Sequence, residues 1–131
     1  MPATAMNHFT ILTDDVEGTV RFYNDLLGLA AGPRPNFEFP GAWLYAGGAP
    51  ILHVIGGRPQ SELRAGVIDH MAFSGRDLAS TLAALKARGI EHVCRRQVGS
   101  GTWQVFLHDP NGAKVELDFA ADERPGADST A

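Results

Sequence analysis

Three histidines and one glutamate occupy matching places in the two halves of this sequence. His8 and His70 lie 62 residues apart, each near the start of a short stretch with the alternation of a β-strand. His53 and Glu116 lie 63 residues apart, each within the strand that closes its half. Imidazole nitrogens and a carboxylate are donors that divalent first-row metal ions accept. A single histidine on a strand is as often a half-buried polar residue as a metal ligand. The prediction of a metal site therefore depends on the repeat.

Strand geometry is expected to bring these four side chains to one face. Side chains on a strand point alternately to its two faces, and apolar residues stand before and after both His53 and Glu116. If the first and last strands of each half are neighbours, the four side chains converge opposite the apolar core. We therefore predict a metal site formed by His8, His70 and Glu116. His53 is either a fourth ligand or an acid–base group, because a histidine with a pKa of about 6.5 suits proton transfer.

The elements that must position these residues follow the same order twice. Strand alternation, helical spacing, and the capping and turn residues predict β-α-β-β-β in each half. The first half covers residues 7–56. It is predicted to begin with a strand at 7–13 and a helix that carries Val16, Val20, Tyr23 and Leu27 and ends at Gly28. A short edge strand within 29–39 and a hairpin of 42–46 and 50–55 follow.

The second half, residues 67–120, follows a linker at 57–66 and repeats the pattern. It predicts a strand around His70, a helix capped by Asp77 that carries Leu78, Leu82 and Leu85, and strands at 90–98, 102–107 and 113–119. The turn sequence Asp109-Pro110-Asn111-Gly112 joins the last two strands. Residues 121–131 are small and polar and predict a loose tail. The fold class is therefore α+β, built from two βαβββ modules.

The overall composition bounds the classes of partner. Of 131 residues, 44% are hydrophobic and 20% are charged, as in an ordinary globular domain. The formal charge of −4 argues against a nucleic-acid partner, because no basic stripe is present to neutralise phosphates. No apolar run approaches about 18 residues, so we expect no membrane partner and a cytoplasmic protein. Cys94 is the one cysteine in the sequence, which excludes an internal disulfide.

The sequence resembles the vicinal oxygen chelate superfamily, which includes glyoxalase I, extradiol dioxygenases, methylmalonyl-CoA epimerase, and fosfomycin and bleomycin resistance proteins. The residues that carry the resemblance are Asn7-His8, the helix end Phe22-Tyr23-Asn24-Asp25-Leu26-Leu27-Gly28-Leu29, then Ile68-Asp69-His70, and Asp109-Pro110-Asn111-Gly112 with Val115-Glu116-Leu117. The resemblance implies a single domain over residues 5–120. In it, two βαβββ modules pair into an open-sided eight-stranded barrel around a divalent metal ion, which chelates a small substrate through vicinal oxygens.

The reaction expected within this superfamily depends on His53. Extradiol dioxygenases have a histidine at the equivalent place as an acid–base group, beside two histidines and a carboxylate that hold Fe²⁺. Glyoxalase I usually has a glutamate there, and its glutathione-binding positions correspond to Leu12 and Gly57 here, which do not match. Against the dioxygenase, Phe106 stands where a tyrosine is usual. The leading hypothesis is an extradiol-type ring-cleaving dioxygenase that uses Fe²⁺.

Two alternatives stay open. The first is a glyoxalase I-like lyase or isomerase in which all four residues bind Ni²⁺, Zn²⁺ or Mn²⁺. The second is a non-catalytic protein that binds a small ligand, as bleomycin resistance proteins do. A homodimer is favoured in either case, and the modules can pair within one chain or across two. Aromatic residues that either line the pocket or belong to the core are Phe37, Phe39, Trp43 and Trp103, and a loop over 37–46 is expected at the mouth.

Overall fold

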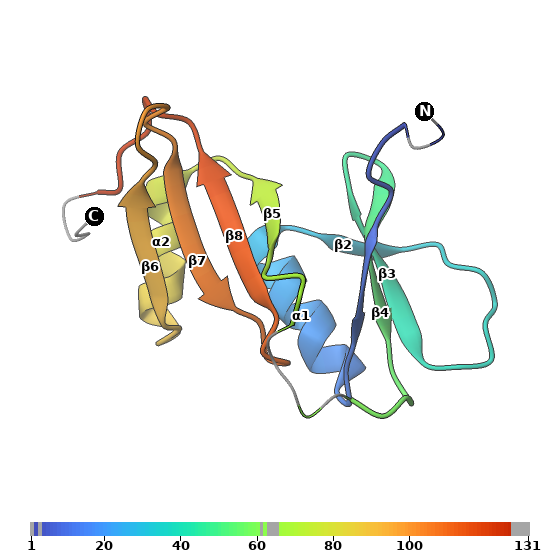
Figure 1. The fold of residues 1–131 in the computed structure, drawn as a ribbon. Helices are drawn as coiled ribbons and strands as arrows, with labels where there is room; N and C mark the ends of the chain where they lie inside the picture. The colour runs from blue at the N-terminus through green and yellow to red at the C-terminus, as the bar shows by residue number, and fades with distance from the viewer. Residues whose placement is uncertain (1, 3, 61, 63–65, 127–131) are drawn as a thin grey trace. The chain divides into compact units, whose positions relative to one another are not determined.

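The computed structural model describes residues 2, 4–60, 62 and 66–126. The chain forms two compact units, Met1–Glu62 and Leu63–Ala131. Each contains one helix and one four-stranded sheet (Figure 1). No helix in the described part of the chain is long and apolar enough to cross a membrane.

The first unit contains five elements in the expected order. They are β1 (Phe9–Leu12), α1 (Val16–Leu27), β2 (Ala30–Gly32), β3 (Gly41–Ala46) and β4 (Ala49–Ile55). The strand order in the sheet is β1-β4-β3-β2. β1 runs parallel to β4, and the other neighbours are antiparallel. The first and last strands of the unit are therefore neighbours, as the predicted site requires.

The second unit repeats this topology. Its elements are β5 (Met71–Ser74), α2 (Leu78–Ala87), β6 (His92–Arg96), β7 (Trp103–His108) and β8 (Lys114–Phe119). The strand order is β5-β8-β7-β6, and β5 is parallel to β8. The β-α-β-β-β repeat expected from the sequence is confirmed. Of the predicted linker at 57–66, residues 61 and 63–65 lie outside the described part.

The core of each unit lies between its helix and one face of its sheet. In the second unit, Leu78, Leu82 and Leu85 of α2 are buried as predicted, together with alternate residues of β7 and β8. In α1 the fully buried residues are Thr19 and Tyr23, whereas Val16, Val20 and Leu27 are half-buried. Thr19 tolerates burial because its hydroxyl is hydrogen bonded to that of Thr13 at 3.0 Å.

The helix caps differ from the prediction in one unit. The Asp15 side chain accepts a hydrogen bond from the Gly18 N–H and caps α1. At α2, the predicted cap Asp77 adopts a left-handed conformation with φ 67°, and its side chain makes no capping bond. Glu123 fills this role, because its carboxylate accepts the Leu78 N–H at 2.7 Å. The predicted cap is wrong because the acceptor comes from a distant part of the chain.

The same residue makes a second contact from the segment predicted as a loose tail, 121–131. The backbone carbonyl of Glu123 accepts a hydrogen bond from the Trp103 indole at 2.9 Å. Trp103 is only 6% exposed and shares its face of β7 with the buried Val105 and Leu107. Glu123 therefore contacts both α2 and β7 of the second unit, and residues 127–131 lie outside the described part. Trp103 belongs to the core, so it does not line a substrate pocket.

Candidate metal and active site

The structure brings the four predicted residues together as two pairs, one in each unit. His8 and His70 lie one residue before β1 and β5, so each enters its sheet just ahead of the strand. His53 lies within β4 opposite Thr10 of β1, and Glu116 lies within β8 opposite Ala72 of β5. The sheet register places His8 near His53, and His70 near Glu116.

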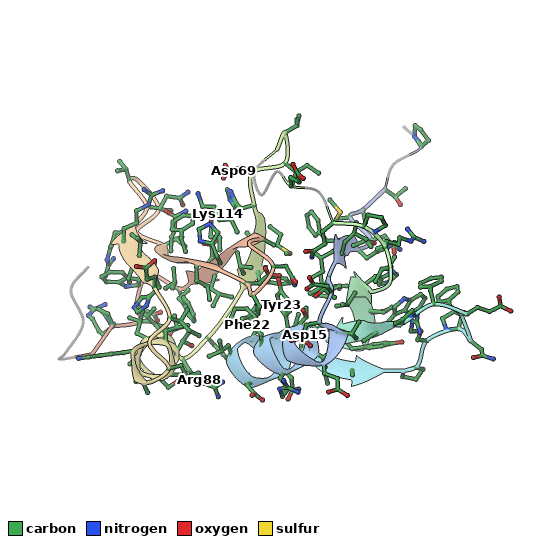
Figure 2. The ribbon with its side chains drawn as sticks, turned by 90° about the horizontal axis from the view of Figure 1, so that it is seen from below. Asp15, Phe22, Tyr23, Asp69, Arg88 and Lys114 are labelled. Carbon is green, nitrogen blue, oxygen red and sulfur yellow. The ribbon has the colours of Figure 1, made fainter. Side chains whose placement is uncertain are left out.

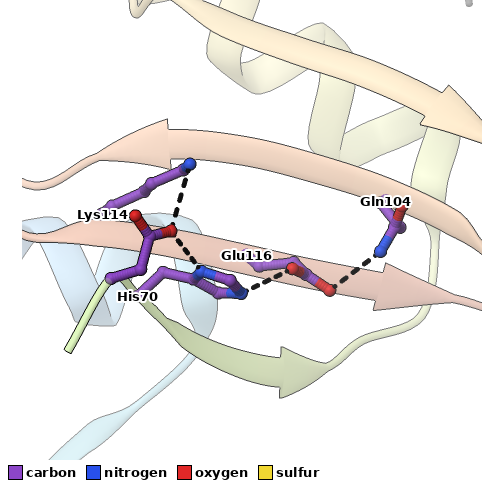
Figure 3. A network of polar contacts seen from close by, with 5 residues as sticks. His70, Gln104, Lys114 and Glu116 are labelled. Carbon is purple, nitrogen blue, oxygen red and sulfur yellow. Dashed lines mark hydrogen bonds and ion pairs between the residues drawn. The ribbon is translucent and has the colours of Figure 1, made fainter. Parts of the chain in front are cut away.

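In the second unit, Glu116 and His70 are in direct contact (Figure 3). The His70 Nε2 atom lies 2.9 Å from Glu116 Oε1. The other carboxylate oxygen, Oε2, accepts a hydrogen bond from the Gln104 amide at 3.3 Å. The Glu116 side chain is 8% exposed although it points away from the helix. A buried carboxylate on this face is stable only with such donors or a cation beside it.

Asp118 adds a second acid two residues further along the same face. Its Oδ1 atom is buried and has no hydrogen-bond partner among the described residues. Burial, together with hydrogen bonding to and repulsion from Glu116, raises the pKa of Asp118 to about 6. The hydrogen bond from Asp118 in turn lowers the pKa of Glu116. Above pH 6 this face therefore carries two adjacent carboxylates, an arrangement that favours a bound cation.

In the first unit, the site consists of stacked rings. The His8 and His53 rings are 3.7 Å apart between centroids and 12° from parallel. Trp43, which lies opposite His53 on β3, stacks on the other side of His53 at 4.2 Å and 11°. A cavity of about 230 Å³ is lined by these three residues and by Phe37 and Phe39, among others. The predicted pocket role of Trp43, Phe37 and Phe39 is therefore supported, but residues 41–46 form β3 and not a loop.

The environment of His53 suits a neutral imidazole. Its Nε2 atom lies 3.2 Å from the Pro50 carbonyl oxygen, an acceptor, which places the proton on Nε2 and leaves Nδ1 free to accept one. Burial and the adjacent His8 lower the pKa of His53, and the bond to Pro50 opposes them only in part. His53 therefore stays neutral to a lower pH than an exposed histidine does.

Asn7 and Asp69, each directly before a candidate histidine ligand, hold the rings of those histidines. The Nδ1 atom of His8 lies 2.7 Å from the Asn7 side-chain oxygen, and that of His70 lies 2.7 Å from a carboxylate oxygen of Asp69. Both partners are acceptors, so Nδ1 carries the proton. In His8 this leaves the Nε2 lone pair available to an ion. In His70 the Nε2 lone pair faces the Glu116 carboxylate, a contact that requires a proton or a bound cation between the two atoms. Metal-bound histidines are commonly oriented in this way.

The sequence contained a signal for this arrangement, since Asn7 and Asp69 are themselves 62 residues apart. Gln104 was missed because nothing local marks it. It is recognisable only after β7 is paired with β8, where it lies opposite Asp118.

The donors fit a divalent first-row ion. They comprise oriented imidazole nitrogens and a buried carboxylate, beside which the Oδ1 atom of Asp118 has no hydrogen-bond partner among the described residues. Neither unit, within its described residues, gathers three histidine, cysteine or acidic side chains that could hold a metal together.

The sequence was compared with protein families and with known proteins. The model of the Glyoxalase/Bleomycin resistance protein/Dioxygenase superfamily matches residues 5–117. The chain belongs to this superfamily. A curated member, "Glyoxylase I 4" of Arabidopsis thaliana, is 30% identical over 122 residues, which cover 87% of this chain and 70% of that protein.

Solved structures of the superfamily share the fold. A glyoxalase family protein from Bacillus anthracis has a TM-score of 0.73 and 18% identity, covering 90% of this chain and 96% of its own. Lactoylglutathione lyase from Agrobacterium tumefaciens has a TM-score of 0.64 and 19% identity, covering 92% and 97%.

A mutant of the fosfomycin resistance protein FosX from Listeria monocytogenes, complexed with Mn(II) and 1S,2S-dihydroxypropylphosphonic acid, has a TM-score of 0.72 and 16% identity, covering 90% and 93%. These likenesses confirm the expected α+β fold class.

Proposed function

We propose that this protein is a metal-dependent lyase or isomerase of the glyoxalase type, acting on a small substrate with two adjacent oxygen atoms. The observation that carries the proposal is the matched pair of Nδ1 contacts, Asn7 with His8 and Asp69 with His70. Two histidines held in one tautomer at equivalent places of a repeat are arranged as ligands. The names of the Arabidopsis relative and of the Agrobacterium lyase support this reaction class over the dioxygenase.

His8, His70 and Glu116 would hold the ion. A bound divalent cation would polarise a substrate oxygen and stabilise the negative charge that develops on it when a neighbouring proton is removed. Gln104 keeps Glu116 in place through its hydrogen bond to Oε2, and Asp69 fixes the His70 ring. Fe²⁺, Ni²⁺, Zn²⁺ and Mn²⁺ all accept this set of donors.

His53 would transfer the proton. An imidazole binds a metal through a lone pair in its ring plane, so two ligands of one ion need ring planes that meet at it. The rings of His8 and His53 are nearly parallel and stacked, which does not allow both to bind the same ion in this arrangement. The lowered pKa of His53 keeps it in the form that accepts a proton.

The aromatic wall beside His53 would bind the organic part of the substrate. Trp43, Phe37 and Phe39 provide apolar surface beside the ring. Leu12 and Gly57 occupy the positions where glutathione-dependent lyases carry their arginine and asparagine, so the proposal does not extend to glutathione.

An extradiol-type dioxygenase that uses Fe²⁺ is the second candidate. The observation in its favour is the separation of His53 from the ligand set, which leaves two histidines and one carboxylate for the metal. A ring-cleaving reaction requires oxygen uptake, whereas an isomerisation or lyase reaction does not.

One set of measurements tests both candidates. The full chain is analysed for bound metal, and then assayed with catechols for oxygen uptake and with hemithioacetals of several thiols for isomerisation. Stoichiometric metal with isomerisation and no oxygen uptake supports the proposal. Iron with oxygen uptake supports the second candidate. A protein that takes up no divalent metal overturns both and favours a non-catalytic binding protein.

A further inference from the structure

A groove on the second unit lies beside the candidate metal ligands and is lined by two cations and one acid. Its volume is about 590 Å³, and its lining includes Glu91, Val93, Arg95, Phe106, His108 and Lys114. The register of β6, β7 and β8 places Val93 opposite Phe106, and Phe106 opposite Glu116. These residues therefore share the face of the sheet that carries Glu116.

Both cationic groups lie over the same aromatic ring. The Arg95 guanidinium is 4.8 Å from the Phe106 ring centroid, and the Lys114 ammonium is 5.3 Å from it. The His70 ring meets Phe106 edge-on at 6.0 Å between centroids. Phe106 therefore connects the groove to one of the candidate metal ligands.

One of the two cations has no ion-pair partner among the described residues. Lys114 is 3.4 Å from Asp69, and that carboxylate is shared with His70 (Figure 3). Arg95 is exposed and forms no ion pair within the described residues, although Glu91 lines the same groove. Figure 2 shows Lys114 and Asp69 on the side of this sheet away from Arg88 at the end of α2. Lys114 thus lies on the face of the sheet away from the helix, and Arg95 lies on the same face because both cations are over the Phe106 ring.

From this geometry we propose that the groove binds the anionic group of an organic substrate, a carboxylate or a phosphoryl group, through Arg95 and Lys114. The Phe106 ring and Val93 contact the carbon skeleton of the substrate. An arginine fork and a lysine ammonium are the side chains best suited to oxyanions. This inference rests on the proposed function, for which it names the substrate class as organic acids.

The test uses the metal-free full chain and three probes of similar shape: benzoate, phenyl phosphate and neutral benzyl alcohol. Titrations followed by amide NMR shifts give both affinity and location. Saturable binding of at least one anion is expected, with the largest shifts in β6 and β7, and at least about tenfold weaker binding of benzyl alcohol. Comparing benzoate with phenyl phosphate shows which oxyanion the groove prefers.

Substitutions then assign the binding to the two cations. The Arg95→Gln/Lys114→Gln double variant should bind the anion at least about tenfold more weakly, whereas Arg95→Lys, which keeps the charge, should lose less. The matched control is Arg96→Gln/Lys86→Gln, which removes the same charge. Arg96 lies over Trp103 on the opposite face of β6, and Lys86 lies in the last turn of α2. The control should bind within about twofold of wild type, since its residues do not line the groove.

The inference is overturned if benzyl alcohol binds as well as the anions, if no anion saturates the wild type, or if the control weakens binding as much as the double variant. Shifts centred on Trp43 would also overturn it. Because these titrations need no metal, they fail or succeed independently of the proposed function. Metal content of the double variant should equal that of wild type, so a loss of metal would show that the cations support the ligand pair instead.

Discussion

The two units repeat one topology, but their site faces differ in chemistry. In the first, aromatic rings stack: His8 on His53, and His53 on Trp43. In the second, His70, Glu116 and Gln104 form a chain of polar contacts in which the carboxylate is buried. The side chains occupy equivalent positions in the two sheets, but their chemical character differs. One unit is suited to proton transfer beside an apolar wall, and the other is suited to holding a cation.

A substitution of Glu116 tests the proposed cation site of the second unit and should have the largest effect on metal affinity. Glu116→Ala should lower metal affinity at least about 100-fold, since even partners of metal ligands contribute 10- to 100-fold. Metal content after dialysis, together with calorimetric titration, measures the loss. Glu91→Ala, an exposed acid just before β6, is the control and should bind metal as wild type does. Equal affinity of both variants would contradict the assignment of Glu116.

A substitution of His53 tests the proton-transfer role proposed for the first unit. His53→Gln should keep the metal but lower turnover by about 10²- to 10⁴-fold, the usual contribution of a positioned acid–base group. Parallel measurement of metal content and turnover separates the two roles. If the variant loses its metal instead, His53 is a ligand, and the four-ligand form of the lyase is the better description.

The helix caps provide a third comparison, because α1 is capped locally and α2 is capped by Glu123. Glu123→Ala should lower the free energy of unfolding by about 1 kcal/mol, as Asp15→Ala should at α1. Asp77→Gly should leave stability unchanged or raise it, since Asp77 makes no capping bond and its φ of 67° suits glycine. Urea denaturation checks all three variants. A loss of about 1 kcal/mol in Asp77→Gly would contradict the cap at Glu123.

The smallest expected effect is a shift of the pH profile. Because burial and His8 lower the pKa of His53, the neutral ring persists as the pH falls below its usual value of about 6.5. The acid limb of kcat/KM should therefore lie below pH 6.5. Trp43→Ala uncovers His53 and should move the limb toward higher pH, whereas Trp43→Phe keeps the ring covered and should not. A limb at or above about 6.5 in wild type would contradict the role of His53.

Much of this arrangement could be predicted from the sequence because it depends on local periodicity. Alternation along β4 and β8 decides that His53 and Glu116 point away from the core, and burial of Leu52, Val54, Val115 and Leu117 confirms this. The repeat offset decides which residues are equivalent. The alternation involves residues close together in the sequence, and the repeat involves residues at one fixed separation.

The features that could not be predicted depend on contacts between distant residues. Glu123 caps a helix 45 positions earlier in the chain, and Gln104 reaches Glu116 from the neighbouring strand, 12 positions away. The stacking of His53 between His8 and Trp43 likewise depends on strand register. The residue types alone do not decide whether His53 is a ligand or a base. That assignment depends on the stacking.

We propose that His8, His70 and Glu116 hold the metal and that His53 does not bind it. X-ray absorption spectroscopy of the metal-loaded full chain counts the imidazoles bound to the ion. We expect two imidazoles with oxygen donors, and the same spectrum for His53→Ala. Three imidazoles in the wild type, with one lost in His53→Ala, would show that His53 is a ligand.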